Sequence, residues 1–395
     1  MIFIVMLIAA AFLFTGCKKK EEEAVAEEPV VVVQEWEIPF LNVLTGPIAS
    51  IGEYLQWGAE RAAEEINAAG GIAGKPVKIL RVDTGMEPEK GIVEMSKLVD
   101  TALCVLGPVP EPVIMAAVPV AVEAEMYSFT ATTSYEYAVE YFPWAVSWFP
   151  PTEARLGDIV EAWANLNPEM KTVVQFVENY GPWPGMAAAH TKGLKDAGVE
   201  VLPDVDVPGD AVTFGPQIVK ALASKPDGIV FVCNAEKVAK IIIELKNRGW
   251  ENMNHVLVFS SADDAALYTT GGSAIDGVMI YNYADPNLDT PRWNAFRQAF
   301  KDDHDGIEPF SLSPNYYDAV YMIKEAIEAT GVTGDPDKLA EERVKIRDYC
   351  NNIQDFEGLQ FSWSNENGVP TNKPLFLFKI EGGKKTLFKK IVPTG

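Results

Sequence analysis

The chain has 395 residues, a formal net charge of −23 at pH 7 and four cysteines. This acidic balance argues against nucleic acid as a partner, because neutralising phosphates requires clustered Lys and Arg side chains. The length is sufficient for two domains, each with a hydrophobic core of its own.

The N-terminal segment is apolar apart from Thr15 and Gly16, and Cys17 follows it. The apolar run is short for a membrane span and is typical of the core of a signal peptide. Thr15-Gly16-Cys17 resembles a lipobox, in which the cysteine is acylated and becomes the mature N-terminus. We therefore expect a signal peptide at 1–16 and a lipid on Cys17, with a plain N-terminal anchor helix as the alternative. Three lysines follow Cys17, and the segment 21–37 is acidic and of low complexity, which favours a flexible tether at 17–36.

The next segment, 57–83, has the clearest pattern in the chain. Small and apolar residues recur there at helical spacing, at Ala59, Ala62, Ala63 and Ile66, and charged residues occupy the opposite face. This predicts an amphipathic helix that ends at Gly70-Gly71. Apolar runs at 38–44 and 77–82 predict strands on either side of the helix, which is the start of a parallel α/β sheet.

Strand-like and helical patterns alternate through the rest of the chain. Strands are predicted at 102–106, 126–130, 172–177, 199–202, 228–232, 255–259, 277–281, 359–363 and 375–390. Helices are predicted at 153–166, 185–197, 214–223, 236–248, 292–302 and 316–329. Strands separated by helices predict an α/β protein with two doubly wound, Rossmann-like sheets.

Motifs for catalysis and metal binding are missing from the sequence. None of the three histidines lies in an HExxH motif or near a CxxC pair, so we expect no metal. No GxSxG motif is present, and GxGxxG is missing after the first strand, so neither an enzyme nor a cofactor is indicated. Cys104, Cys233 and Cys350 are expected to be buried thiols, with a Cys104–Cys350 disulfide as the alternative.

The sequence EINAAGGIAG at 65–74 resembles the first helix and turn of bacterial solute-binding proteins of the leucine/isoleucine/valine type. The resemblance continues through LTGP at 44–47 and through 83–88, and in weaker form it covers roughly 37–380. Such proteins capture a small molecule outside the cytoplasm and deliver it to the permease of an ABC importer. The resemblance thus implies a non-enzymatic, monomeric, extracytoplasmic receptor that closes over its ligand, held at the membrane by its lipid anchor.

The resemblance also implies two lobes joined by a three-segment hinge, with the ligand in the cleft between them. We place the crossings near Pro150, Tyr283 and Glu366. Lobe 1 would then comprise 37–150 and 283–366, and lobe 2 would comprise 151–282 and 367–395. A sensor of the same fold that signals to a membrane receptor is one alternative, and an enzyme of two α/β lobes is another.

Ligands of open α/β sheets bind beyond the carboxyl ends of the strands. In lobe 1 these ends are 107–112 and 130–135, where free backbone N–H groups and hydroxyls favour an anion, although Thr and Ser are also ordinary helix caps. The resemblance implies that the ligand carboxylate binds at these two loops. The candidate ligand-binding residues are Ile51, Pro110, Glu111, Thr132, Thr133, Ser134, Tyr135, Trp148, Tyr180, Asn234, Glu236 and Asp263.

Two of these positions bear on specificity. Glu111 stands where amino-acid-binding relatives have an anchoring serine, and a carboxylate there would repel a ligand carboxylate unless it is protonated or turned away. Asp263 and Asp264 are the nearest candidates for the acid that binds the ligand ammonium in relatives. We therefore expect leucine, isoleucine and valine to bind poorly, and an aromatic or other non-standard molecule to bind better.

Overall fold

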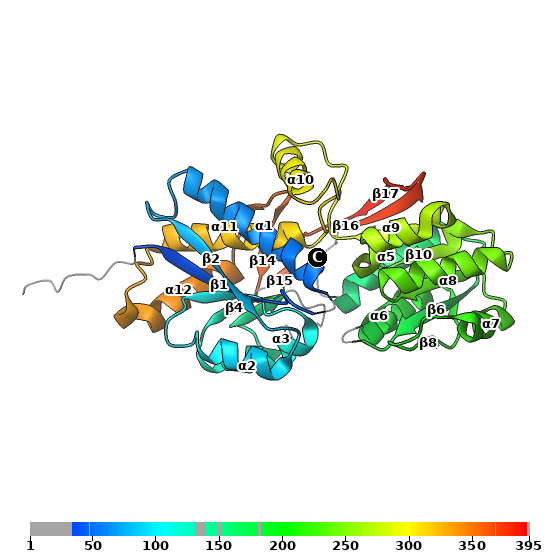
Figure 1. The fold of residues 1–395 in the computed structure, drawn as a ribbon, viewed down its shortest axis with the longest axis horizontal. Coiled ribbons are helices and arrows are strands. Elements are labelled where there is room, and N and C mark those ends of the chain that lie inside the picture. Colours follow the sequence, from blue (N-terminus) through cyan, green and yellow to red (C-terminus); the bar gives the residue numbers. More distant parts are fainter. Residues whose placement is uncertain are drawn as a thin grey trace, which may run out of the picture.

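The structure is a computed structural model that describes residues 34–46, 48–130, 140–147, 152–180, 183–367 and 369–392. Figure 1 shows two lobes side by side along the long axis of the molecule. Among the described residues, no helix has both the length and the apolar character needed to cross a membrane. The predicted signal peptide, Cys17 and most of the predicted tether lie outside the described residues.

Lobe 1 contains a five-stranded parallel sheet in the order β2-β1-β3-β4-β5. Its strands are β1 (Trp36–Asn42), β2 (Val77–Asp83), β3 (Cys104–Leu106), β4 (Tyr127–Thr130) and β5 (Ala145–Ser147). Its helices are α1 (Ala49–Ala68), α2 (Pro88–Ser96), α3 (Glu111–Glu123), α10 (Pro291–Asp303), α11 (Ser313–Thr330) and α12 (Leu339–Asn351). Helix α1 packs along α11, and α2 packs along α3.

Lobe 2 contains a sheet in the order β17-β16-β11-β10-β9-β6-β7, with β8 beside β6. Its strands are β6 (Thr172–Glu178), β7 (Glu200–Val201), β8 (Val205–Val207), β9 (Gly228–Val232), β10 (Val256–Val258), β11 (Met279–Asn282), β16 (Leu375–Glu381) and β17 (Lys384–Ile391). Its helices are α5 (Thr152–Asn165), α6 (Trp183–Asp196), α7 (Gly215–Ala223), α8 (Ala235–Asn247) and α9 (Ala265–Gly271). In the described sheet only β16 runs opposite to the other strands, pairing antiparallel with β11 and with β17. A parallel sheet in lobe 1 and a largely parallel sheet in lobe 2, each with helices around it, confirm the predicted α/β class.

The chain passes between the lobes after β11 and again before β16. The second of these passages lies later than the expected Glu366, because the short hairpin of β14 (Asn365–Glu366) and β15 (Val369–Pro370) still packs on lobe 1. There Asn365 Nδ2 donates to the Cys350 carbonyl of α12 at 2.8 Å. Lys373 Nζ reaches Asn315 Oδ1 of α11 at 3.2 Å, so the passage to lobe 2 follows Lys373.

Segment 356–363 also differs from its expectation. The single strand predicted at 359–363 is instead a short antiparallel pair, β12 (Phe356–Glu357) with β13 (Ser362–Trp363). Gly358 lies between them, and an added Cβ there would come within 2.8 Å of Asp318 Oδ2. Glycine is typical of positions at which another part of the chain approaches this closely.

The cysteines behave as predicted. Cys104, Cys233 and Cys350 are all buried free thiols, so the Cys104–Cys350 disulfide is not formed. Burial raises the pKa of Cys104 to about 12 and raises the pKa of Cys350 well above its usual value. Protonated, apolar thiols of this kind are packing residues rather than nucleophiles.

Candidate ligand-binding site

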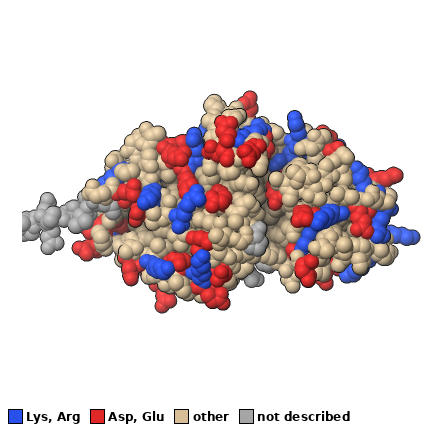
Figure 2. All heavy atoms as spheres, viewed as in Figure 1, with Lys and Arg blue, Asp and Glu red and all other residues tan. Residues whose placement is uncertain are grey.

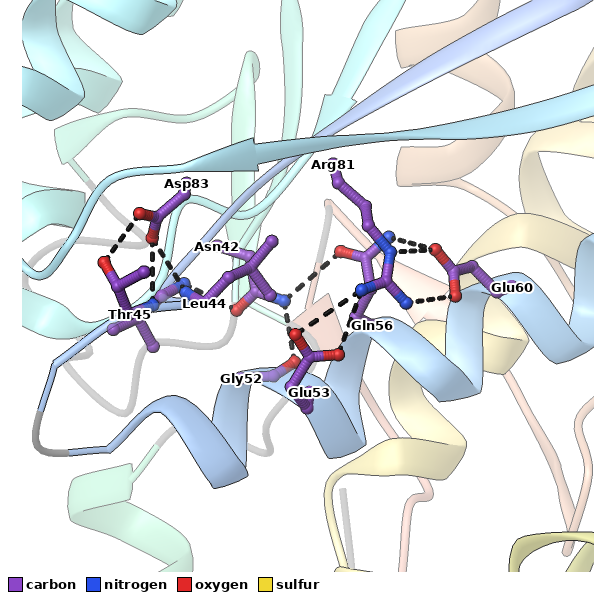
Figure 3. Close-up of polar contacts among 10 residues, drawn as sticks. Asn42, Leu44, Thr45, Gly52, Glu53, Gln56, Glu60, Arg81 and Asp83 are labelled. Atoms are coloured by element: carbon purple, nitrogen blue, oxygen red, sulfur yellow. Dashed lines mark hydrogen bonds and ion pairs between the residues drawn. The ribbon is translucent and has the colours of Figure 1, made fainter. Parts of the chain in front are cut away.

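The loop after β1 is held by one carboxylate, that of Asp83 at the end of β2. Its Oδ1 accepts from the backbone N–H groups of Leu44 at 2.8 Å and Thr45 at 3.2 Å, and its Oδ2 accepts from the Thr45 hydroxyl at 2.7 Å (Figure 3). Burial acts to raise the pKa of Asp83, but these hydrogen bonds outweigh it and hold the pKa far below its usual value. Leu44 and Thr45, which follow β1, are therefore held at the end of β2.

The N-terminal part of α1 lies unusually close to β1. Asn42 Nδ2 donates to the Gly52 carbonyl at 2.8 Å, and a Cβ on Gly52 would come within 1.7 Å of the Val43 carbonyl oxygen. Arg81 of β2 binds Glu60 and Glu53 on the next turns of the helix, at 2.7 and 3.1 Å (Figure 3). These contacts place the start of α1 at the carboxyl edge of the lobe 1 sheet.

A cavity of about 820 Å³ lies between the lobes. From lobe 1 it is lined by the start of α1, one side of α10 and the loop before α11, and from lobe 2 by α9 and the β16–β17 turn. The lining residues are Ser50, Ile51, Tyr54, Asp263, Asp264, Ala265, Ala266, Tyr268, Thr269, Pro286, Asn287, Arg297, Lys301, Ile307, Glu308, Pro309, Phe310, Gly383, Lys384 and Lys385. Its size is in the range of small-molecule sites.

The lobe 1 wall of the cavity has an apolar and aromatic part, formed by Ile51, Tyr54 and Phe310. Tyr54 packs edge-on to Phe300, with ring centroids 5.4 Å apart, and lies near Phe310 at 6.4 Å. Burial raises the pKa of Tyr54, and the charge of Asp264 from lobe 2 raises it further. A tyrosine held in this way offers an apolar ring and a neutral hydroxyl to a ligand.

The lobe 2 wall is organised around Asp263, whose side chain is only 2% exposed. Its Oδ1 accepts from the Tyr268 hydroxyl at 2.6 Å. Its Oδ2 accepts from Asn282 Nδ2 and from Lys385 Nζ, with which it forms an ion pair. Burial and the Asp263 charge together hold the pKa of Tyr268 far above its usual value, so the hydroxyl stays a donor.

Two further cations line the cavity from α10. Arg297 donates to both oxygens of Glu308, at 2.5 and 2.6 Å, and Lys301 Nζ lies 2.7 Å from Glu308 Oε1. Burial alone would raise the pKa of Glu308, but these hydrogen bonds lower it. On the face that Figure 2 shows, basic and acidic side chains are interspersed over both lobes.

The structure places two predicted residues in this cavity, Ile51 and Asp263. A third, Tyr180, lies elsewhere between the lobes, where its hydroxyl is 4.0 Å from Met86 Sδ of lobe 1. Burial raises the pKa of Tyr180, so it is a neutral contact between the two lobes. Thr132, Thr133, Ser134, Tyr135 and Trp148 lie outside the described residues.

The other four predicted residues stand at the starts of two helices. Pro110 is the N-cap of α3 and Glu111 is its first residue, where a carboxylate favours the positive end of the helix dipole. Asn234 caps α8 by accepting from the Lys237 N–H at 3.1 Å. Glu236 is exposed and pairs with Lys240 at 2.6 Å. None of the four lines the cavity described above, and their contact with a ligand stays a prediction.

Sequence reasoning missed most of the cavity's charged residues, including Lys385, Arg297 and Lys301. The pattern KK at 384–385 after Gly382-Gly383 signals a hairpin, but nothing local to it signals a partner at Asp263. In the ranges that the structure describes, no group of three or more His, Cys, Asp or Glu side chains is placed to hold a metal ion.

The histidines have structural partners. His255 lies 2.8 Å from Glu169 Oε1 and 2.9 Å from the Asp227 carbonyl oxygen. His190 is buried against the Tyr281 hydroxyl at 2.9 Å, and burial lowers its pKa to about 3. A neutral, enclosed imidazole of this kind does not serve as a general acid or base near neutral pH.

Comparison with known proteins agrees with this architecture. The family model described as "Periplasmic binding protein" matches residues 35–385. A Leu/Ile/Val-binding protein homologue from Brucella melitensis is 27% identical over 305 residues, which cover 75% of this chain and 80% of the relative.

Solved structures extend the likeness at the level of the fold. A leucine-binding protein from Thermotoga maritima has a TM-score of 0.76 at 22% identity, and the alignment covers 91% of this chain and 99% of that one. A solute-binding protein from R. palustris in complex with benzoate has a TM-score of 0.74 at 19% identity, with coverages of 91% and 97%. The chain therefore belongs to the periplasmic binding protein family, in its leucine/isoleucine/valine-binding branch, whose members bind a solute outside the cytoplasm for delivery to an ABC importer.

Proposed function

We propose that the cavity between the lobes captures one small organic molecule and that closure of the lobes presents it to the permease of an ABC importer. The observation that carries this proposal is the lining of the cavity, which comes from α1 and α10 of lobe 1 and from α9 and the β16–β17 turn of lobe 2. A ligand in such a position contacts both lobes at once. Its binding free energy therefore favours the closed arrangement.

The proposed ligand is amino-acid-like or an aromatic or other organic acid. An aromatic wall around Tyr54 and Phe310 suits an apolar or planar body, and the charged residues of the opposite wall suit a polar end. Among the structural neighbours, one is a leucine-binding protein and another holds benzoate, so the fold accommodates both classes.

A lipid on Cys17 is the proposed attachment to the membrane, and the folded part is proposed to act as a monomer. The support is the Thr15-Gly16-Cys17 pattern and the acidic segment that follows it. Radiolabelled palmitate should be incorporated into the wild-type protein and not into the Cys17→Ala variant. Equal labelling of the two would refute the assignment.

The ligand itself is best identified by native mass spectrometry of the protein purified without refolding. We expect a stoichiometric small molecule that is released unchanged when the protein is denatured. Turnover of the released compound by the protein would instead support the two-lobe enzyme. Deletion of the gene for this protein should abolish uptake of the same compound, and unaffected uptake would favour the sensor.

Closure makes a separate prediction. Saturation with the identified ligand should reduce the radius of gyration measured by small-angle X-ray scattering, because the lobes are joined by short connecting segments and approach one another across the cleft. A stripped sample prepared by unfolding and refolding is the control. Superimposable profiles at saturation would contradict a hinge mechanism.

A further inference from the structure

The cavity contains an acid that is already neutralised by the protein's own ammonium group. Asp263 is 2% exposed, and its partner Lys385, on β17, retains 15% exposure toward the cavity that both residues line. Asp263 also accepts from Tyr268 and Asn282, so its two oxygens have three donors. A ligand ammonium could use this acid only by displacing Lys385.

Displacement of Lys385 is opposed by the way the hairpin is fixed. Lys385 pairs with Ile380 of β16 in the antiparallel register, next to the turn at Gly382-Gly383. The carbonyl oxygen of Lys385 also accepts from Asn287 Nδ2 at 3.0 Å, which ties the hairpin to the segment that connects the lobes. The backbone of Lys385 is therefore fixed within reach of Asp263.

The other acids of the described lining are engaged as well. Glu308 is paired with Arg297 and Lys301. Asp264 caps α9 by accepting from the Ala266 N–H at 2.6 Å, and it is partly exposed, so water competes for any cation that it attracts. The cavity thus offers no buried carboxylate without a partner among its described lining residues.

The same arrangement favours an anion. An ammonium group has three N–H donors, and Asp263 is the one carboxylate that the Lys385 Nζ contacts in the described structure. Four cationic side chains (Arg297, Lys301, Lys384 and Lys385) and three anionic ones line the cavity, although the whole chain carries a net charge of −23. The described lining therefore carries one more positive than negative side chain, in a protein that is acidic as a whole.

We infer that Lys385 determines the ligand class: it occupies the acid that an α-ammonium group would need, and it donates to the carboxylate of a small organic anion that has no ammonium group. The apolar body of that anion packs against Ile51, Tyr54 and Phe310. This inference rests on the proposed capture of a small molecule in this cavity and makes its chemistry specific.

The test compares ligands that differ only in the α-amino group. Isothermal titration calorimetry on the full folded protein, stripped of ligand, would use 4-methylpentanoate against leucine and 3-phenylpropanoate against phenylalanine. We expect each acid to bind at least about tenfold more tightly than its amino acid, since the amino acid would bring a second ammonium group beside Lys385.

The variant Lys385→Met should weaken binding of the acids by about 10- to 100-fold, the range for one hydrogen bond to a charged group. It should also narrow or reverse the preference for acids, because Asp263 becomes available to an ammonium ion. Lys389→Met is the matched control: it removes the same charge from an exposed residue of the same strand that lies outside the cavity lining. If Lys385→Met fails to fold, Asp263→Asn/Lys385→Met removes both charges and should bind neither class well.

The outcomes separate the inference from the function on which it rests. Tighter binding of leucine than of 4-methylpentanoate by the wild type, unchanged in Lys385→Met, would overturn the role of Lys385 and leave small-molecule capture intact. An equal loss of acid binding in Lys389→Met would also overturn it, because the effect would then be one of general charge. Absence of any bound small molecule, both in the native mass spectrum and across these four ligands, would contradict the proposed function itself.

Discussion

Two lysine–carboxylate pairs of lobe 2 are enclosed, and they differ in how many N–H donors of the lysine are already bound to protein acceptors. At the first, Lys237 of α8 is paired with Glu178 at the end of β6 at 2.6 Å, and the two side chains are 9% and 8% exposed. Lys237 Nζ also donates to the carbonyl oxygens of Pro208 at 2.9 Å and Gly209 at 2.7 Å. All three of its N–H donors are therefore used within the protein.

At the second pair, Lys385 contacts one carboxylate, that of Asp263, and lines the cavity between the lobes. The same two residue types thus serve different purposes. Where the ammonium group is saturated by protein acceptors, the pair fixes a loop to the sheet. Where the ammonium group keeps unbound N–H donors, it can bind an anion. Burial of a lysine is consequently a weaker indicator of function than the number of acceptors around it.

The largest expected effect would come from breaking the saturated pair. Lys237→Met leaves Glu178 buried without its cation, and loss of one partner of a buried pair costs about 3–5 kcal/mol in the free energy of unfolding. Urea denaturation followed by circular dichroism would measure it. Lys240→Met, which breaks the exposed pair with Glu236 on the same helix, is the control and should change stability by less than about 1 kcal/mol. Similar losses of stability in both variants would show that the buried Lys237–Glu178 pair contributes no more than the exposed pair.

Asp318 and Lys373 form a third buried pair, in lobe 1, whose effect on stability depends on pH. Burial raises the pKa of Asp318 to about 6, while the charge of Lys373 acts to lower it. Because the folded state then holds this proton more tightly than the unfolded state, the contribution of Asp318 to stability falls as pH rises from about 4 to 6, by up to about 3 kcal/mol.

Asp318→Asn should remove that decline, so that the wild type loses stability relative to the variant as the pH rises through this window. The measurement is urea denaturation of both proteins at several pH values between 4 and 7. Parallel curves for the two proteins would contradict the raised pKa of Asp318. If the wild type instead gained stability relative to the variant as the pH rises, the charge of Lys373 would outweigh the effect of burial on the pKa of Asp318.

The smallest of the three expected effects on stability concerns the cavity pair. Lys385→Met should cost about 1–3 kcal/mol, less than Lys237→Met, because Asp263 keeps Tyr268 and Asn282 as donors and Lys385 is partly exposed. Asp263→Asn/Lys385→Met should restore part of the loss, since no charge is left unpaired. A loss as large as that of Lys237→Met would make the cavity pair structural and remove the distinction between the two pairs.

Local sequence was sufficient for most elements of the two sheets. Helix α1 is an example. Its apolar face repeats at Ala59, Ala62, Ala63 and Ile66, and it ends just before the glycines at 70–71 that predict its end. Both features depend on interactions within a few residues of the chain. The start of α1 at Ala49 is different, because no side chain caps it and its position depends on Asn42 and on the close approach of Gly52 to Val43.

Helix α12 shows where pattern reasoning fails. Its buried face includes Arg343 and Glu342, so the apolar repeat that would predict it is interrupted. The Arg343 guanidinium donates to the carbonyl oxygens of Val99, Ala102 and Ala124, from two loops of lobe 1. Those acceptors are remote in sequence, and only the folded chain shows why a charged residue is buried there.

The candidate site divides in the same way. Asp263 could be predicted only through the family resemblance, which places an ammonium-binding acid after this strand of lobe 2, here β10. Its partner Lys385 could not, because the two residues are 122 positions apart and meet only when the β16–β17 hairpin joins the lobe 2 sheet beside β11. The sequence alone indicated the family through its motifs and the α/β class through local periodicity, and it predicted the sheet edge at which a ligand would bind. The tertiary structure decided the charge that the cavity presents, since that depends on which distant side chains neutralise one another.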